Sequence, residues 1–192
     1  MKSLFFTLVT ILSVGMVSAN NGSPIVIPVK SSESTIKWVG KKVLGSHEGT
    51  VKVKNGSLDF DGDKFIGGII TIDMTTINCT DLQAGQGKEK LETHLTSDDF
   101  FGTATHQEAK LNITKVISRG KSGDYKIIAN LTIKGITKEI KFDAVVKDGQ
   151  ANANIVVDRT DFNVRYGSGS FIDSLGDKTI YDEFEMAVNL RF

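Results

Sequence analysis

Apolar and polar residues alternate along most of the chain, from Thr35 to its last residue. In "TIKWVGKK", Ile36 and Trp38 share one face of an extended segment, while Lys37 and Val39 share the other. Because side chains of a strand point alternately to opposite faces, this period of two predicts β-strands with one apolar face. Segments with this pattern are found at 35–42, 49–63, 109–117, 125–135, 138–146, 150–158 and 179–192, and 64–74 is a further extended segment.

Short turn signals separate these segments. Within the segment 49–63, Asn55-Gly56 predicts a type I′ hairpin turn that divides it into two strands, because both central positions of that turn need positive φ and these residue types tolerate it. Further turns are expected at 61–63, 120–124, 135–137 and 148–149. Short turns between successive strands indicate antiparallel pairing.

The segment 64–74, "KFIGGIITIDM", is apolar at both odd and even positions. Ile66 and Ile70 would lie on one face, and Phe65 and Ile69 on the other. This pattern predicts a strand that is buried on both faces, so another element should cover it from outside.

One helical segment interrupts the alternation at about 81–96. The sequence "DLQAGQGKEKLETHL" places Leu91 and Leu95 four residues apart, which is the spacing of one helix face. Gly85 and Gly87 weaken the helix, so its first turns should be irregular.

Together these elements predict an all-β fold with about eight antiparallel strands and one helical excursion. A long, twisted sheet would expose two edges unless it closed on itself, so a closed barrel is expected. The strand that carries Trp38 and the last strand are the natural closing partners. An eight-stranded barrel is wide enough to hold one small ligand.

The first nineteen residues differ from the rest of the chain. Lys2, the apolar run 4–14 and "VSA" before position 20 predict a signal peptide that is cleaved after Ala19. The apolar run is shorter than the ~20 residues of a membrane-spanning helix. We therefore expect export to the periplasm, an N-terminal extension at 20–34 and one barrel domain at 35–192.

The remaining composition excludes several functions. The 23 basic and 23 acidic residues balance and form no block, so no nucleic-acid partner is expected. Cys79 is the only cysteine, which excludes an internal disulfide and suggests a small buried side chain. His47, His94 and His106 lack the spacing of metal ligands, and no metal or cofactor is expected.

The aromatic residues suggest the candidate site. Eleven phenylalanines in a barrel that is too wide to pack solid point to an apolar cavity with a polar mouth. Residues expected to line this tunnel are Trp38, Ile70, Ile72, Leu131, Ile133, Phe142 and Phe184. Residues expected near its opening are Phe100, Phe101 and Phe162.

The stretch "DRTDFNVRYGSGSF", residues 158–171, has more than one interpretation. It is interpreted first as a mobile connection at the rim of the barrel, since no helix follows its glycines. Arg159 and Ser168 are candidates for contact with an anionic head group, because guanidinium groups bind phosphate oxygens in pairs. Arg159 could instead form a salt bridge with Asp158 or Asp161.

Several motifs resemble the YceI-like family of polyisoprenoid-binding proteins. They are "TIDMTTI" at 71–77, "HLTSDDFF" at 94–101, "LTIKGITKEIKF" at 131–142 and "DRTDFNV" at 158–164. Asn163 and Gln107 depart from the glycine and proline that the family often has at these positions. The resemblance implies a lipocalin-like barrel in the periplasm whose tunnel takes an isoprenoid chain, as in a polyprenyl phosphate or an isoprenoid quinone.

The expected function is therefore carriage or storage of an isoprenoid lipid without catalysis, with transient membrane contact and a homodimer left open. An outer-membrane β-barrel is the first alternative, because the chain ends in Phe192 after alternating apolar positions. The second alternative is an enzyme that acts on an isoprenoid lipid, with Asp158, Arg159 and Asp161 as an acid–base cluster.

Overall fold

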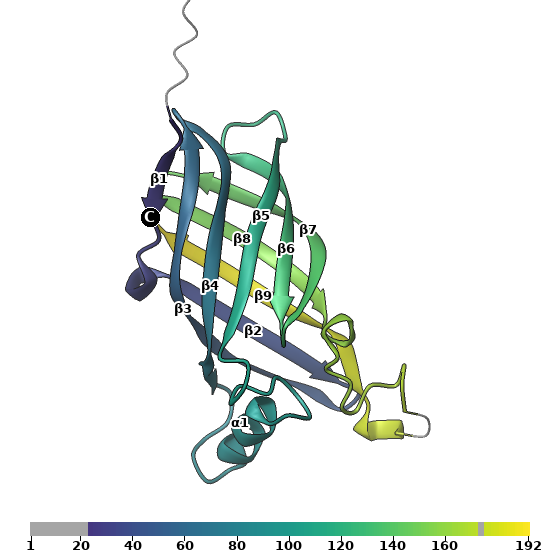
Figure 1. Cartoon of the computed structure of the whole chain (residues 1–192). Coiled ribbons are helices and arrows are strands. Elements are labelled where there is room, and N and C mark those ends of the chain that lie inside the picture. The colour runs from purple at the N-terminus through teal and green to yellow at the C-terminus, as the bar shows by residue number, and fades with distance from the viewer. Residues whose placement is uncertain (1–22, 173–174) are drawn as a thin grey trace, which may run out of the picture.

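Antiparallel strands build nearly the whole structure, which is a computed structural model (Figure 1). It describes residues 23–172 and 175–192, so the predicted signal peptide lies outside the described residues. The strands are β1 Ile25–Pro28, β2 Thr35–Lys42, β3 Gly45–Asp61, β4 Lys64–Cys79, β5 Glu108–Ser118, β6 Asp124–Ile133, β7 Ile136–Lys147, β8 Gln150–Asp158 and β9 Ile180–Arg191. The helices are α1 Lys88–Thr96 and three short 3-10 turns, η1 Ser31–Glu33, η2 Arg159–Phe162 and η3 Gly176–Lys178.

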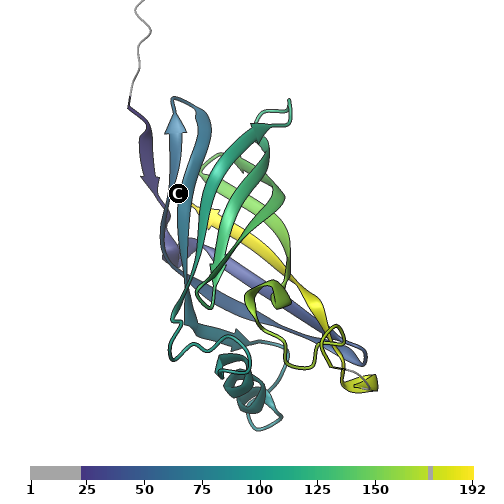
Figure 2. The ribbon, with the colours of Figure 1, turned by 45° about the vertical axis from the view of Figure 1, so that its right-hand side comes forward.

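Eight of the strands form a closed ring. From β3 the order runs through β2, β9, β8, β7, β6, β5 and β4, and β4 pairs with β3 again. The predicted closed barrel of about eight antiparallel strands is thus confirmed, and Figure 2 shows the strands wrapping around its interior. The predicted closing partners, β2 and β9, pair from Thr35 opposite Asn189 to Lys42 opposite Ile180.

The ninth strand, β1, lies in the segment expected to be an N-terminal extension, and the sequence pattern did not predict it. It pairs with the far half of β3, where Ile25 lies opposite Phe60. Beyond it, Val29 N donates to Gly56 O at 2.9 Å and Lys30 N donates to Arg191 O at 2.8 Å. These bonds connect β3 to β9 beyond the first residue of β2. The strand β1 and the turn after it therefore occupy the space between β3 and β9 that β2 does not reach.

The hairpin predicted at Asn55-Gly56 is wrong. Both residues lie inside β3, which continues for 17 residues until the turn at Gly62. A Cβ at Gly56 would lie 2.8 Å from Ile69 O and 2.8 Å from Ile70 Cδ1. The glycine therefore permits close packing of β3 on β4, and no positive φ is involved.

The prediction that β4 is buried on both faces is also wrong. Asp59 of β3 pairs with Gly67, and the next residue, Phe60, pairs with Phe65, so Ile66 is an extra residue in a β-bulge. The bulge turns Ile66 to the outer face, and Ile69 lies on that face because it alternates with the inward Ile70. Both Ile66 and Ile69 are exposed. That face is therefore exposed at Ile66 and Ile69, although Thr71 on the same face is buried.

The helix α1 occupies only the second half of the predicted helical segment. Its first residue follows Gly87, and both Gly85 and Gly87 have positive φ, which agrees with the expected irregular first turns. It lies beside one open end of the barrel (Figure 1). No helix in the described residues is long and apolar enough to cross a membrane.

The opposite end of the barrel is filled by aromatic rings. Phe60 lies with its ring centroid 5.5 Å from that of Phe65 and 5.5 Å from that of Phe192, and Phe65 lies 5.6 Å from Tyr125. Tilted and edge-to-face pairs at these distances are favourable packing arrangements. The barrel therefore has one plugged end and one end that α1 borders.

Candidate functional site

Two apolar cavities lie inside the barrel. The mouth-side cavity, next to α1, has a volume of about 160 Å³, and the inner cavity has a volume of about 70 Å³. Both are lined by Ile72, Leu131 and Met186, so they adjoin each other. Each exceeds the ~10–15 Å³ that one water molecule needs, which shows that side chains do not fill the interior.

The helix α1 covers the mouth-side cavity without packing tightly on it. Leu91, His94 and Leu95 line the cavity, yet no residue of the helix is fully buried. An apolar helix face that is only half-buried borders a space rather than a solid core. The helix therefore forms one side of the cavity mouth.

A row of aromatic rings leads from the rim into the barrel. Successive ring centroids are 4.2 Å apart for Tyr166 and His94, 5.4 Å for His94 and Phe100, and 5.3 Å for Phe100 and Phe101. Phe101 then lies 6.3 Å from Phe184 on β9. Because Tyr166 is exposed and Phe100 is buried, the row connects solvent with the apolar interior.

Nine of the ten residues that were expected to line the tunnel or its opening line these cavities. The mouth-side cavity takes Trp38, Phe100, Phe101, Ile133 and Phe184, the inner cavity takes Ile70 and Phe142, and both take Ile72 and Leu131. Phe162 lines neither cavity, because its ring packs in the core and is 1% exposed. It belongs to η2, in which both Arg159 and Phe162 are buried.

Sequence reasoning missed several lining residues. They are His47, Met74, Ile77, Leu91, Ala109 and Met186. The alternation within β4, β5 and β9 already places Met74, Ala109 and Met186 on the inward faces of these strands, so they could have been predicted. His47 and Leu91 reach the mouth only through tertiary packing, so no local pattern could have assigned them.

Arg159 is buried at the mouth and bonds mainly to backbone carbonyls. Its guanidinium donates to Val164 O at 2.7 Å, Ile180 O at 3.0 Å and Tyr181 O at 3.1 Å. Its charged partner is Asp182, at 3.4 Å, and not the expected Asp158 or Asp161. Burial lowers the pKa of Arg159, while the nearby carboxylates act in the opposite direction. Arg159 thus ties η2 to the beginning of β9.

The proposed acid–base cluster around Arg159 is not assembled. The Asp158 carboxylate accepts hydrogen bonds from Thr160 N at 2.8 Å and from Thr160 Oγ1 at 2.6 Å, so it caps η2. Asp161 pairs instead with Lys138 of β7 at 3.3 Å. The two carboxylates therefore serve different local contacts.

Ser168 is fully buried and lines neither cavity. Its N–H donates to Arg165 O, and its hydroxyl oxygen accepts from Ser170 N at 3.2 Å. The N–H groups of Phe171 and Ile172 both donate to Ser168 O. These donors are used inside the turn, so the "GSGS" segment offers no anion-binding cradle at Ser168.

A polar cluster holds α1 to the barrel. Cys79 N donates to Glu92 Oε1 at 2.8 Å, while Lys88 Nζ donates to Cys79 O and forms an ion pair with Glu92 at 3.0 Å. Next to these contacts, Cys79 Sγ donates to Asp81 Oδ1 at 3.0 Å, and His47 Nδ1 lies 2.8 Å from Asp81 Oδ2. The end of β4 is therefore fixed both to β3 and to the helix.

The same contacts shift the ionisation of the acidic groups. Partial burial acts to raise the pKa of Asp81, but hydrogen bonds from Cys79, His47 and the N–H of Glu48 outweigh it and lower the pKa to about 2. Burial, followed by the bond to Asp81, raises the pKa of Cys79. Cys79 is therefore a buried thiol that donates a hydrogen bond, rather than a thiolate nucleophile.

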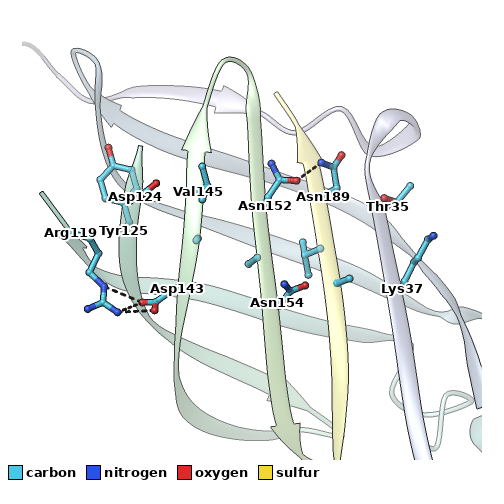
Figure 3. A pocket seen from close by; sticks show the side chains of 14 residues that line it. Thr35, Lys37, Arg119, Asp124, Tyr125, Asp143, Val145, Asn152, Asn154 and Asn189 are labelled. Carbon is cyan, nitrogen blue, oxygen red and sulfur yellow. Dashed lines mark hydrogen bonds and ion pairs between the residues drawn. The ribbon is translucent and has the colours of Figure 1, made fainter. Parts of the chain in front are cut away.

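A larger groove on the outer wall differs from these cavities in chemistry (Figure 3). It has a volume of about 720 Å³ and is lined by residues of β2, β9, β8, β7 and β6, of which Ala144, Ala153 and Val188 also line the inner cavity. Arg119 pairs with Asp143 through both carboxylate oxygens, and Asn189 donates to Asn152. Polar groups that already bond to one another and face solvent do not suit an apolar ligand, so the interior cavities are the candidate site.

Related proteins share this fold. BcnA from Burkholderia cenocepacia has a TM-score of 0.68 at 21% identity, covering 84% of this chain and 98% of BcnA. A polyisoprenoid binding domain from Saccharophagus degradans, implicated in plant cell wall breakdown, has a TM-score of 0.57 at 14% identity, covering 85% of this chain and 95% of that domain.

Sequence similarity is greater for two other bacterial proteins. The UPF0312 protein of Shewanella denitrificans is 30% identical over 135 residues, which are 69% of this chain and 68% of that protein. The UPF0312 protein of Staphylococcus aureus strain USA300 is 33% identical over 134 residues, which are 66% of this chain and 69% of that protein. Residues 28–192 match the YceI-like domain, from the end of β1 to the last residue. The chain therefore belongs to the YceI-like family.

Proposed function

We propose that the protein binds the isoprenoid chain of a lipid inside the barrel, for carriage or storage. The observation that carries this proposal is the pair of adjoining apolar cavities, which the aromatic row connects to the mouth. A protein of the same fold from Saccharophagus degradans is described as a polyisoprenoid binding domain, which supports this ligand class.

The physical chemistry of the interior fits such a chain. Each methylene buried from water contributes about 0.8 kcal/mol, so one five-carbon isoprene unit contributes up to ~4 kcal/mol. Binding inside a preformed barrel offsets much of the cost of ordering the chain. The chain end would point toward the aromatic plug at Phe60 and Phe65, and the head group would stay at the mouth near Lys42 and His94.

No catalytic step is part of this proposal. Asp158 caps a turn, Asp161 pairs with Lys138, and Arg159 bonds to backbone carbonyls. The predicted signal peptide, residues 1–19, supports a periplasmic location for the carrier.

The outer wall favours a binding protein over the outer-membrane alternative. A barrel in a lipid bilayer needs an outward band of apolar side chains. The outward positions of β2 and β9 carry Lys37 and Glu185 instead, while their inward positions carry apolar residues. Apolar side chains thus face the cavities from these strands.

Two measurements test the proposal. Mass spectrometry of the organic extract from protein purified out of its own host should show an isoprenoid lipid, and an extract holding only phospholipid or nothing would count against it. The single tryptophan, Trp38, lines the mouth-side cavity, so its fluorescence should report occupancy during titration. Geranylgeranyl phosphate and a short-chain ubiquinone separate the two head-group classes, and oleate serves as the straight-chain control.

A further inference from the structure

Exposed apolar side chains gather along the rim of the mouth, from the β2–β3 hairpin to Tyr166, which stacks on His94 of α1. We propose that this apolar lip docks the mouth onto the surface of an anionic lipid bilayer. The inference rests on the proposed function, because a carrier that takes lipid from a bilayer needs its mouth at that surface. The apolar lip is defined by the exposed residues Val43, Leu44, Tyr166, Phe171, Ile172 and Tyr181.

Three chain segments form the lip, and hydrogen bonds join them. Val43 N, in the β2–β3 hairpin, donates to Thr179 O at 3.1 Å. Ile180 N donates to Gly167 O at 2.8 Å, which joins the beginning of β9 to the turn that follows η2. The three segments that carry the lip therefore lie side by side, at the lower right in Figure 1.

The lip borders the cavity directly. Lys42, Ile180 and Tyr181 line the mouth-side cavity from this side, while Leu91 and Leu95 of α1 line it from the other. A surface that touches the lip would thus lie next to the opening. A lipid could then pass from the bilayer into the cavity with little exposure of its chain to water.

The exposure of these residues is unusual for a surface in water. Leu44 is 64% exposed at the tip of the β2–β3 hairpin, and Phe171 is 50% exposed on a turn. Isolated apolar residues on a surface need no explanation, but a contiguous group on projecting turns indicates an interaction site. Projecting tips suit insertion into a bilayer interface better than they suit a flat partner surface.

The charges of the lip identify the kind of bilayer. Lys42, Arg165 and Lys178 lie among the apolar residues, and Asp177 is the single acidic residue in the described parts of segments 42–45, 165–172 and 175–181. Asp182 follows these segments and accepts from Ser170 Oγ, but it is paired with the buried Arg159. Within those described parts, none of the three basic residues forms a salt bridge. Arg165 stacks over the ring of Phe171 at 4.3 Å, so its charge stays beside an apolar anchor. Basic residues beside inserted apolar groups favour anionic head groups.

Sedimentation with vesicles tests the docking surface. The purified protein is mixed with phosphatidylcholine vesicles with or without phosphatidylglycerol, and the bound fraction gives a partition coefficient. Leu44→Asp should weaken binding by roughly tenfold or more, because an apolar anchor becomes a charged one. Lys42→Glu should weaken binding to the anionic vesicles by at least about fivefold and leave binding to neutral vesicles nearly unchanged.

Ile69→Asp is the matched control. Ile69 is 45% exposed on the outer wall of β4, away from the mouth, so its replacement should leave vesicle binding unchanged. Thermal unfolding of each variant checks that the barrel is intact. Equal binding of wild type, Leu44→Asp and Ile69→Asp would overturn the proposal.

Two further readouts separate docking from cavity binding and from self-association. In detergent solution without vesicles, Trp38 fluorescence should show the same isoprenoid affinity for wild type and Leu44→Asp. If vesicle binding depends on Leu44 but no isoprenoid binds, docking is supported and the proposed function is wrong. If an isoprenoid binds but vesicle binding does not depend on Leu44, docking alone is wrong. If Leu44→Asp converts a dimer to a monomer and leaves vesicle binding unchanged, the lip joins two copies and the proposal is wrong.

Discussion

Replacement of two buried alanines by leucine tests whether the interior is hollow where the structure shows a cavity. Ala109 on β5 and Ala129 on the neighbouring β6 both point inward and are 2% and 0% exposed. Ala109 lines the mouth-side cavity, whereas Ala129 lines neither interior cavity. Replacing each with leucine adds the same three carbon atoms to two different environments.

The expected stability changes have opposite signs. At Ala109 the added carbons enter an empty apolar space, and their burial contributes up to ~2.4 kcal/mol at about 0.8 kcal/mol each. The lost rotamer freedom of leucine costs about 0.5–1 kcal/mol, so Ala109→Leu should stabilise the lipid-free protein by about 1–2 kcal/mol. At Ala129 the same carbons meet packed neighbours, and Ala129→Leu should destabilise the protein by about 1–3 kcal/mol.

Urea unfolding followed by far-ultraviolet circular dichroism measures both changes. The protein must be stripped of lipid first, because a ligand that binds only the folded state adds its own stabilisation. Ala109→Leu should also lower the affinity for an isoprenoid probe, since the leucine occupies ligand space. If Ala109→Leu destabilised the protein as much as Ala129→Leu, the mouth-side space would not exist and the carrier proposal would lose its basis.

Three other changes have defined outcomes. Arg159→Leu leaves buried carbonyls without donors, so thermal unfolding should show a loss of about 2–4 kcal/mol; a loss below ~1 kcal/mol would show that Arg159 does not hold the mouth together. The lowered pKa of Asp81 means that its contribution is present above about pH 4 and is lost as the pH falls toward about 2. Asp81→Asn should therefore cost about 1 kcal/mol at neutral pH, after allowance for solvent screening, and almost nothing near pH 2; urea unfolding that showed the same difference at both pH values would contradict this origin. Phe65→Ala removes a ring of the aromatic plug, so mass spectrometry of extracted lipid should show longer chains than wild type, and an unchanged length distribution would show that the plug does not limit the chain.

The strands could be predicted because burial on one face specifies the register of a strand. A shift by one residue would turn every apolar side chain outward, so the alternation has to agree with the fold. The predicted segments 35–42 and 150–158 coincide with β2 and β8. Closure followed from the same reasoning, since eight such strands leave two costly edges.

The local sequence pattern gave a wrong turn prediction where tertiary packing requires a glycine. Asn55-Gly56 is the usual sequence of a tight turn, yet Gly56 permits the close contact between β3 and β4. Gly68 does the same, because a Cβ there would lie 2.4 Å from Ser57 O, and its φ of 155° suits glycine. A sequence shows that a glycine is present, but the approaching backbone that requires it comes from a distant segment.

The polar part of the site could not be predicted for a related reason. Arg159 was expected to pair with neighbours in sequence, but its acidic partner is Asp182, and its other acceptors are carbonyls of residues 164, 180 and 181. Only the folded barrel brings the beginning of β9 beside η2. A buried guanidinium needs several acceptors, and the chain supplies them from whichever segments meet there.

The origin of the hollow lies in the small residues more than in the aromatic ones. The phenylalanines and Tyr125 at the far end fill the barrel, so aromatic content alone does not create space. Small side chains line the cavities from three strands: Ala109 on β5, Ala144 on β7, and Ala151 and Ala153 on β8. An eight-stranded barrel has a nearly fixed circumference, so short side chains at inward positions leave the axis empty where leucine or phenylalanine would fill it. Alanines at inward positions are therefore the sequence signal for a hollow barrel. They keep the inner cavity open even beside the aromatic plug, where Tyr125 lies opposite Ala144 and Ala144 lies opposite Ala153.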